Sequence, residues 1–123
     1  MINSNKSSLT MLEVVVVVII VAILSTFAVP AFRKTIEKSR EKLAVSNLNL
    51  IVNAEKLYRA RYDSYIACED LEAINNNLTL DIEGKYFDYK VTTSGKYDFT
   101  AFATGQKTEE QYTIDPEGNI NKE

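Results

Sequence analysis

The fold is decided by residues 8–32, which have the sequence SLTMLEVVVVVIIVAILSTFAVPAF. Between Leu9 and Phe32 the only charged residue is Glu13, and the stretch from Val14 to Leu24 is entirely apolar. A helix from Leu9 to Phe32 rises about 36 Å, which is enough to cross a bilayer core of about 30 Å. A buried strand is a poor alternative, because strands rarely exceed about ten residues. We therefore expect a helix over residues 9–32, since a backbone in lipid must satisfy its own hydrogen bonds.

Three explanations of this apolar segment compete. It is a permanent single-pass anchor, a secretory signal peptide with Thr26 and Ala28 as small residues before the cut, or a membrane helix that is later extracted to build an assembly. The first two leave Glu13 unexplained. A carboxylate near the end of a spanning helix is unfavourable and usually functional. A signal peptide also prefers bases, and not an acid, before its apolar core.

The order of residues around Glu13 resembles the N-terminal segment of type IV pilins and of type II secretion pseudopilins. The family pattern is a small residue, a hydrophobic residue, Thr, two hydrophobic residues, Glu, a long apolar run and then Pro. Thr10, Glu13 and Pro30 match this pattern in register. The resemblance covers residues 8–32 closely and extends to the rest of the chain as a shared architecture.

The resemblance implies that a prepilin peptidase removes a leader, residues 1–8, by cutting between Ser8 and Leu9. It also implies N-methylation of the new terminus at Leu9. The family usually has Gly at the position of Ser8 and Phe at that of Leu9, so the chain departs from the pattern at both. Because Ser8 keeps a small side chain, we still expect processing at this bond.

Leu9, Thr10 and Glu13 are the subunit-assembly residues that the resemblance implies. In the family, the glutamate is thought to pair with the amino terminus of a neighbouring subunit. Opposite charges attract far more strongly in a dry core than in water, and an unpaired carboxylate there is costly. The alternative is an interfacial acid with no role. Pro30 predicts a helix kink, because it removes one backbone hydrogen bond; a helix end at the membrane surface is the alternative.

Residues 31–62 show the pattern of an amphipathic helix. Leu43, Leu50 and Leu57 recur at every seventh position after Ile36. We expect this apolar stripe to pack on a sheet of the same chain; a coiled coil is the alternative, weakened by polar residues in the seam. With the apolar segment, the helix would form one rod from Leu9 to about Tyr62, roughly 80 Å long.

Acidic and basic residues are unevenly distributed along the chain. Residues 33–61 hold eight bases and three acids, whereas residues 62–123 hold five bases and thirteen acids. The bases Arg33, Lys34 and Lys38 would normally indicate a cytoplasmic side, which conflicts with the family orientation, in which the head lies outside the cytoplasm. We follow the motif, and we expect the bases to complement acidic heads of neighbouring subunits.

The C-terminal half carries strand signals. Residues 86–91, 97–103 and 111–114 predict three strands, with turns over 92–96 and 115–119 and a short fourth strand from Ile120. Residues 69–74 predict one short helical turn, broken by the asparagines 75–77. The expected fold class is α+β, with a long N-terminal helix packed on a small antiparallel sheet, as in pilins. The expected organisation is a leader (1–8), an apolar helix (9–32) and a globular head (33–123).

Composition excludes several classes of site. The chain has no His and a single Cys, Cys68, so it forms no intrachain disulfide, thiolate zinc cluster or histidine-based catalytic triad. We expect Cys68 to be a small buried or half-buried filler and not a reactive thiol. Asp115 to Asn119 suggests a hairpin turn more than a calcium loop, because the Trp of the family's calcium-binding run is missing. We expect no metal, cofactor or enzymatic activity, and the net charge of -3 makes nucleic acid an unlikely partner.

The sequence therefore predicts a structural subunit of a type IV pilus-like filament. The expected partners are other copies of the chain, a prepilin peptidase, an inner-membrane assembly platform and, before assembly, membrane lipid. The expected location is the inner membrane, with the head outside the cytoplasm, and then an extracellular or periplasmic filament. The alternatives are a pseudopilin of a type II secretion system and, less favoured, a single-pass membrane-anchored binding module.

Overall fold

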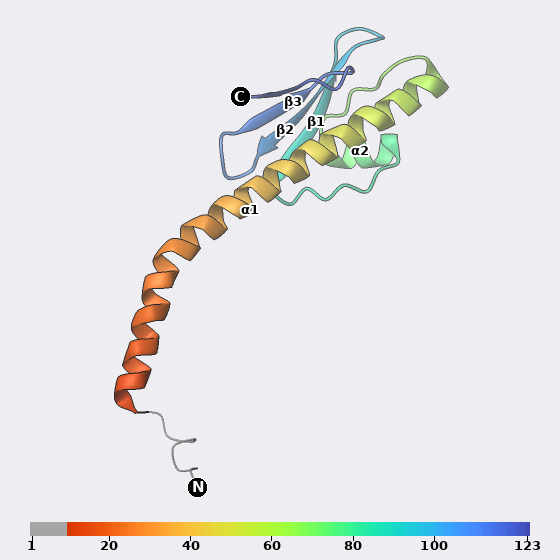
Figure 1. Cartoon of the computed structure of the whole chain (residues 1–123). Helices are drawn as coiled ribbons and strands as arrows, with labels where there is room; N and C mark the ends of the chain where they lie inside the picture. Colours follow the sequence, from red (N-terminus) through yellow and green to blue (C-terminus); the bar gives the residue numbers. More distant parts are fainter. Residues whose placement is uncertain (1–9) are drawn as a thin grey trace. The chain divides into compact units, whose positions relative to one another are not determined.

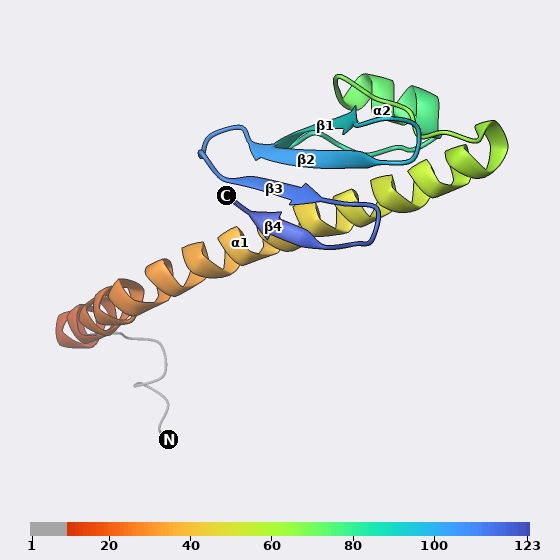
Figure 2. The same ribbon diagram turned by 90° about the horizontal axis from the view of Figure 1, so that it is seen from above.

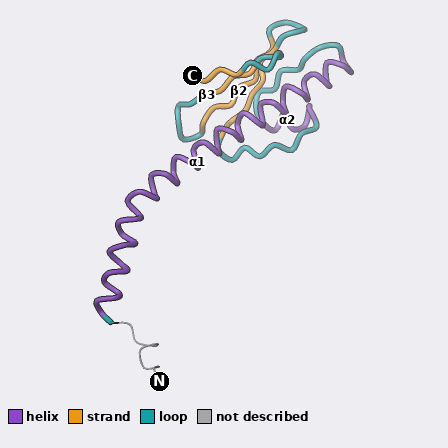
Figure 3. Tube along the Cα trace, in the orientation of Figure 1, coloured by secondary structure: helices purple, strands orange, loops and turns teal. Residues whose placement is uncertain are grey.

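The computed structural model of the protein describes residues 10–123. Its long helix α1, Met11–Tyr62, confirms the helix expected from the sequence and ends at the predicted residue (Figures 1 and 3). Contacts within the chain define two units, with the boundary between Lys38 and Ser39. Both units contain part of α1, and each is described by itself below.

The first unit contributes the apolar part of α1, and its side chains are exposed from Met11 onward. Its few hydroxyl groups bond within the helix: Ser25 Oγ donates to the Val21 carbonyl at 2.7 Å, and Thr26 Oγ1 donates to the Ile23 carbonyl at 2.6 Å. Such back-bonding leaves these polar groups satisfied without water. This part of α1 can therefore lie in an apolar environment without stranding its hydroxyls.

The second unit contains a four-stranded antiparallel sheet in the order β1-β2-β3-β4 (Figure 2). The strands are β1 (Phe87–Thr93), β2 (Phe99–Gly105), β3 (Gln111–Ile114) and β4 (Ile120–Lys122). The predicted meander and the fold class, α+β, are confirmed. The first turn is displaced by two residues from the predicted 92–96, because Thr92 and Thr93 still pair with β2. The chain turns instead through Gly95, at φ +88°, where the Ser94 N–H donates to the Asp98 carbonyl at 3.2 Å.

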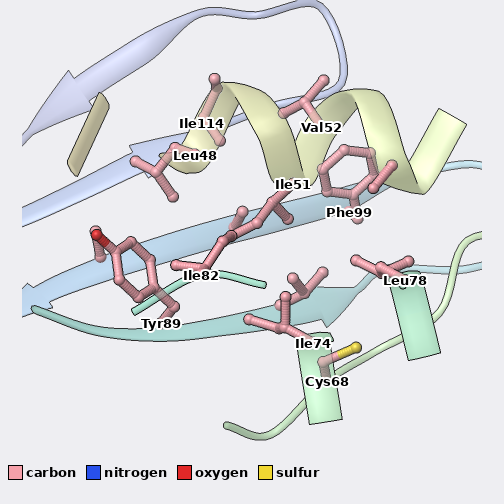
Figure 4. Packing of buried hydrophobic residues seen from close by; sticks show 14 of the residues in the cluster. Leu48, Ile51, Val52, Cys68, Ile74, Leu78, Ile82, Tyr89, Phe99 and Ile114 are labelled. Atoms are coloured by element: carbon pink, nitrogen blue, oxygen red, sulfur yellow. The ribbon is translucent and has the colours of Figure 1, made fainter. Parts of the chain in front are cut away.

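The core of this unit lies between one face of α1 and one face of the sheet (Figure 4). Alternate residues of β1 and β2 point inward, as strand geometry requires. Leu48 and Ile51 of α1 are completely buried, and the Asn47 amide donates to the Tyr89 hydroxyl at 2.9 Å. Lys122 of β4 adds an exposed ion pair to Glu41 of α1 at 3.2 Å. The helix and the sheet therefore enclose one apolar core.

The stripe of Leu43, Leu50 and Leu57 does not pack on this sheet, so that expectation was wrong. These leucines are 42%, 47% and 70% exposed. The face that packs inward is a neighbouring one, centred on Ala44, Leu48 and Ile51. These three residues are completely buried, and the seven-residue repeat is left outside.

Helix α2, Leu71–Leu78, is longer than the single turn predicted, and the asparagines do not break it. Ile74 and Leu78 bury one face. The Asn75 side chain donates to the Ile82 carbonyl and accepts from the Ile82 N–H, both at 3.0 Å. The helix ends only at Thr79, at φ +56°. The asparagine is tolerated because its amide pins the next loop and does not compete for the helix backbone.

Replacing Asp70 by alanine should destabilise the protein by about 1 kcal/mol, because Asp70 is the N-cap of α2. Its Oδ1 accepts a hydrogen bond from the Ala73 N–H at 2.8 Å. Chemical unfolding of the full chain in detergent measures the change. Asp70→Asn is the matched control, since it retains the cap; equal losses in both variants would contradict a capping role.

Cys68 is 1% exposed, which confirms the predicted buried filler. Its N–H donates to the Val91 carbonyl at 2.9 Å, and the Val91 N–H donates back to the Cys68 carbonyl at 2.8 Å. Burial raises the pKa of the thiol. The segment around Cys68 thus covers the outer edge of β1 and keeps an inert thiol in the core.

Candidate functional site

The start of α1 is closed by a reciprocal pair of hydrogen bonds between Thr10 and Glu13. The Glu13 N–H donates to Thr10 Oγ1 at 3.0 Å, and the Thr10 N–H donates to Glu13 Oε2 at 3.4 Å. The Val14 N–H also donates to the Thr10 carbonyl at 3.2 Å. A threonine and a glutamate three residues apart form a capping box, which satisfies two backbone donors at the exposed helix end. The two residues that the motif singled out are therefore in contact.

This capping role is one that the sequence reasoning missed. The signal was present, because Thr-x-x-Glu before an apolar run is the sequence signature of a capping box. The negative charge of Glu13 is also favourable at a helix N-terminus. Glu13 consequently has a partner inside its own chain, and any pairing with another copy must compete with that contact.

Ser8 and Leu9 lie outside the described residues, as does the predicted leader, residues 1–8. The cleavage site and the methylation at Leu9 therefore stay predictions. What the chain order establishes is that Leu9 directly precedes Thr10. An amine created on Leu9 would be one residue from the capping box.

The apolar part of α1 presents a continuous exposed surface. Helix α1 contains an 18-residue window of mean hydropathy 2.9, none of it buried within the chain, so it is long and apolar enough to cross a membrane. Met11, Leu12 and Phe27 are each more than 70% exposed. An apolar surface of this extent marks a membrane or protein contact.

Pro30 lies inside α1, and the helix continues through it. Proline has no N–H, so the Thr26 carbonyl, four residues earlier, lacks its usual amide partner. A helix end at this position, the alternative considered above, is excluded. The kink itself stays a prediction.

Glu55 is a second site residue that was not singled out from the sequence. Its side chain is completely buried in the second unit, and its Oε2 accepts a hydrogen bond from the Ile66 N–H at 3.0 Å. Its Oε1 is buried and has no hydrogen-bond partner among residues 10–123. Burial raises the pKa of Glu55 to about 7, and the bond from Ile66 opposes that rise. The signal was its spacing, since Glu55 follows Leu48 and Ile51 on the apolar face of the helix.

The segment from Asp115 to Asn119 forms the predicted hairpin turn between β3 and β4. Asp115 Oδ1 accepts from the Asn119 N–H at 2.8 Å, and Oδ2 accepts from the Asn119 side chain at 3.0 Å. These bonds lower the pKa of Asp115. Both carboxylate oxygens are engaged in closing the turn. Within the described part of the chain, no three His, Cys, Asp or Glu side chains are grouped to hold a metal ion.

Comparison with known proteins identifies one similar sequence. Over 76 residues, the chain is 34% identical to type II secretion system core protein G of Aeromonas hydrophila. The aligned region makes up 61% of this chain. The chain spans about half the length of that relative, 53%. No model of a known protein family matches the chain, and no solved structure matches it significantly. The similarity supports a relationship to the pilin and pseudopilin family.

Proposed function

We propose that the chain is a structural subunit of a type IV pilus-like filament, made as a membrane-anchored precursor and assembled through its apolar N-terminal helix. The observation that carries this proposal is the exposed apolar surface of α1, with the Thr10–Glu13 box at its start. Water is a poor environment for such a surface. Lipid covers it before assembly, and other copies of the chain cover it in a periplasmic or extracellular filament.

Assembly begins with removal of residues 1–8 by a prepilin peptidase, which creates an amine on Leu9 that is then methylated. The amine of an incoming subunit replaces the Thr10 N–H as the partner of the Glu13 carboxylate. This exchange replaces a hydrogen bond of 3.4 Å from an uncharged amide with an ion pair to a charged amine in a dry core. The second bond of the box, from the Glu13 N–H to Thr10 Oγ1, still holds the helix start.

The work of extraction falls to an inner-membrane assembly platform. The sequence contains no glycine-rich phosphate-binding loop, so the chain itself offers no recognised site for a nucleotide. The role of this chain is therefore that of the polymerising unit.

A pseudopilin of a type II secretion system is a second candidate, favoured by the similarity to core protein G of such a system. Both candidates use the same helix and the same carboxylate. Deletion of the gene in its host separates them. Loss of surface fibres supports the pilus, whereas loss of secreted enzymes with no change in surface fibres supports the pseudopilus.

The intact mass of the chain, extracted from host membranes and from sheared fibres, tests the proposed processing. We expect a chain that begins at methylated Leu9, with residues 1–8 absent. A monomeric chain that retains Met1 would contradict the proposal and favour a membrane-anchored binding module.

A further inference from the structure

The outer face of α1 in the second unit carries a seam that nothing else in residues 10–123 covers. Leu43, Leu50 and Leu57 recur at every seventh residue and are all exposed. The intervening seam positions are small or polar: Ser46, Asn53 and Ala60, all exposed. We call these six residues the leucine seam. Exposed leucines repeated along one helix face mark a contact surface, and the small or polar residues between them make it a poor seam for a two-helix coiled coil.

The charges beside the leucine seam disfavour pairing with an identical seam. One flank carries Lys42 and Lys56 and ends at Asp63, which pairs with Lys96 at 2.8 Å; the other carries Arg40 and Arg61. Two such seams would place bases against bases, which is unfavourable in a helix pair. The partner must therefore present acids around an apolar surface.

The same chain has a surface of that description in residues 69–83, which we call the acidic segment. It holds no base, and five exposed acids lie on it: Glu69, Asp70, Glu72, Asp81 and Glu83. Between them, Leu71 and Leu80 are half-buried and pack at the margin of the core.

The acidic segment is held together as one body. Two hydrogen bonds between the Asn75 side chain and the Ile82 backbone, both at 3.0 Å, fasten its second half to α2. Over residues 10–123, neither these five acids nor the four flanking bases form an ion pair within the chain. Asp70 caps α2 and Arg40 lies 4.3 Å from the centre of the Tyr86 ring, whereas the other four acids and three bases are exposed and within reach of a second copy.

We infer that the leucine seam of one copy binds the acidic segment of the next, an inference that rests on the proposed filament and adds a contact between heads to it. The two surfaces are different patches of one chain, so their contact is heterologous. Repetition of such a contact propagates as an open helix when the rotation does not close a ring. The seam thus supplies a head-to-head contact that is separate from the Glu13 pair.

Two open hollows lie beside the leucine seam and offer space for the partner's side chains. One has a volume of about 460 Å³ and includes Lys42, Ser46 and Asn49 in its lining. The other, of about 470 Å³, includes Lys56 and Ala60. Each hollow is lined by an acid as well as a base, Glu41 beside Lys42 in the first and Asp63 beside Lys56 in the second, so the hollows offer space without selecting a charge.

Disulfide cross-linking of the full chain in its own host tests the contact. Cys68→Ala removes the one native thiol, and Leu50→Cys and Glu72→Cys then place one thiol on each surface. With both cysteines in one chain, we expect a ladder of oligomers longer than the dimer after mild oxidation. With the two cysteines on separate co-expressed copies, we expect dimers only. Dimers from Leu50→Cys alone would overturn the inference, because they would show that the seam pairs with itself.

A charge exchange that retains Cys68 repeats the test without an engineered thiol. The oligomers are captured with a chemical cross-linker that does not react with amines. The double change Lys56→Glu and Arg61→Glu should lower their yield about tenfold, because it places acids against acids. Glu72→Lys with Glu83→Lys should do the same. The combination of all four changes should restore the yield, and failure to restore it would contradict the inference.

A matched control uses equal charge changes away from both surfaces. Lys107→Glu and Glu117→Lys lie in the exposed loop after β2 and in the exposed turn after β3. These changes should leave the oligomers unaltered. Fibres that form normally without the Leu50–Glu72 cross-link would overturn the seam contact and leave the filament proposal standing. A cross-linked ladder in membranes that never yield fibres would support the seam contact and contradict the filament proposal.

Discussion

Replacement of Glu13 by alanine is expected to abolish fibre assembly while removal of the leader at the Ser8–Leu9 bond continues. The change removes the carboxylate that receives the neighbouring amine, and in the dry centre of a fibre nothing else compensates that amine. Electron microscopy of sheared fibres and the mass of the membrane-bound chain give the two readings. Normal fibres from Glu13→Ala would contradict the pairing.

Glu13→Gln separates the two roles of this residue. Glutamine also functions at this position of a capping box, so it keeps the helix start while it removes the charge. We expect Glu13→Gln to fail in assembly as Glu13→Ala does. Thr10→Ser, which keeps the hydroxyl, should assemble normally. Fibres from Glu13→Gln would show that Glu13 only caps the helix.

Acidification is expected to stabilise the head through Glu55. Its pKa is raised from 4.5 to about 7 in the folded state, so folding favours the protonated carboxyl. The resulting stability is fully present below pH 4.5 and is lost as the pH rises to about 7. A shift of this size corresponds to about 3 kcal/mol in the free energy of unfolding between the two limits. Denaturant unfolding of the full chain in detergent, at pH 5 and pH 8, measures the difference.

Glu55→Gln is the matched control for this prediction. Its amide oxygen can still accept the Ile66 N–H, and glutamine does not ionise. The variant should be more stable than the unaltered chain at pH 8. Its free energy of unfolding should also differ much less between pH 5 and pH 8 than that of the unaltered chain. The chain has no histidine, so no other side chain with an ordinary pKa titrates in the middle of this range. An unchanged pH dependence in Glu55→Gln would contradict the assignment.

The long helix and the strand meander were predictable because their signals are local. An apolar run of membrane length admits little besides a helix, and the alternating residues of β1 and β2 indicate strands with one buried face. The hairpin turn at Asp115 was also predictable, since its proline and glycine occupy the positions that a turn requires. The capping box was readable from Thr10 and Glu13, although only the assembly role was inferred from them.

The remaining features depend on tertiary contacts. The burial of Ala44, Leu48 and Ile51, in place of the stripe at Leu43, depends on which face of the helix meets the sheet. Helix α2 survives its asparagines because Asn75 bonds to Ile82, seven residues away. A local sequence pattern predicts neither feature, because each depends on a contact between segments that come together only in the folded chain.

Electron cryomicroscopy of the assembled material tests the central claim most directly, namely that the apolar N-terminal helix serves polymerisation once the leader is removed. The account predicts a helical fibre in which the apolar part of α1, from Met11 to Phe32, forms a central bundle of packed helices. Each Glu13 should lie beside the amino terminus of a neighbouring subunit. Chains that lack residues 1–8 and yet remain single in the membrane, in cells with a working export machinery, would contradict it.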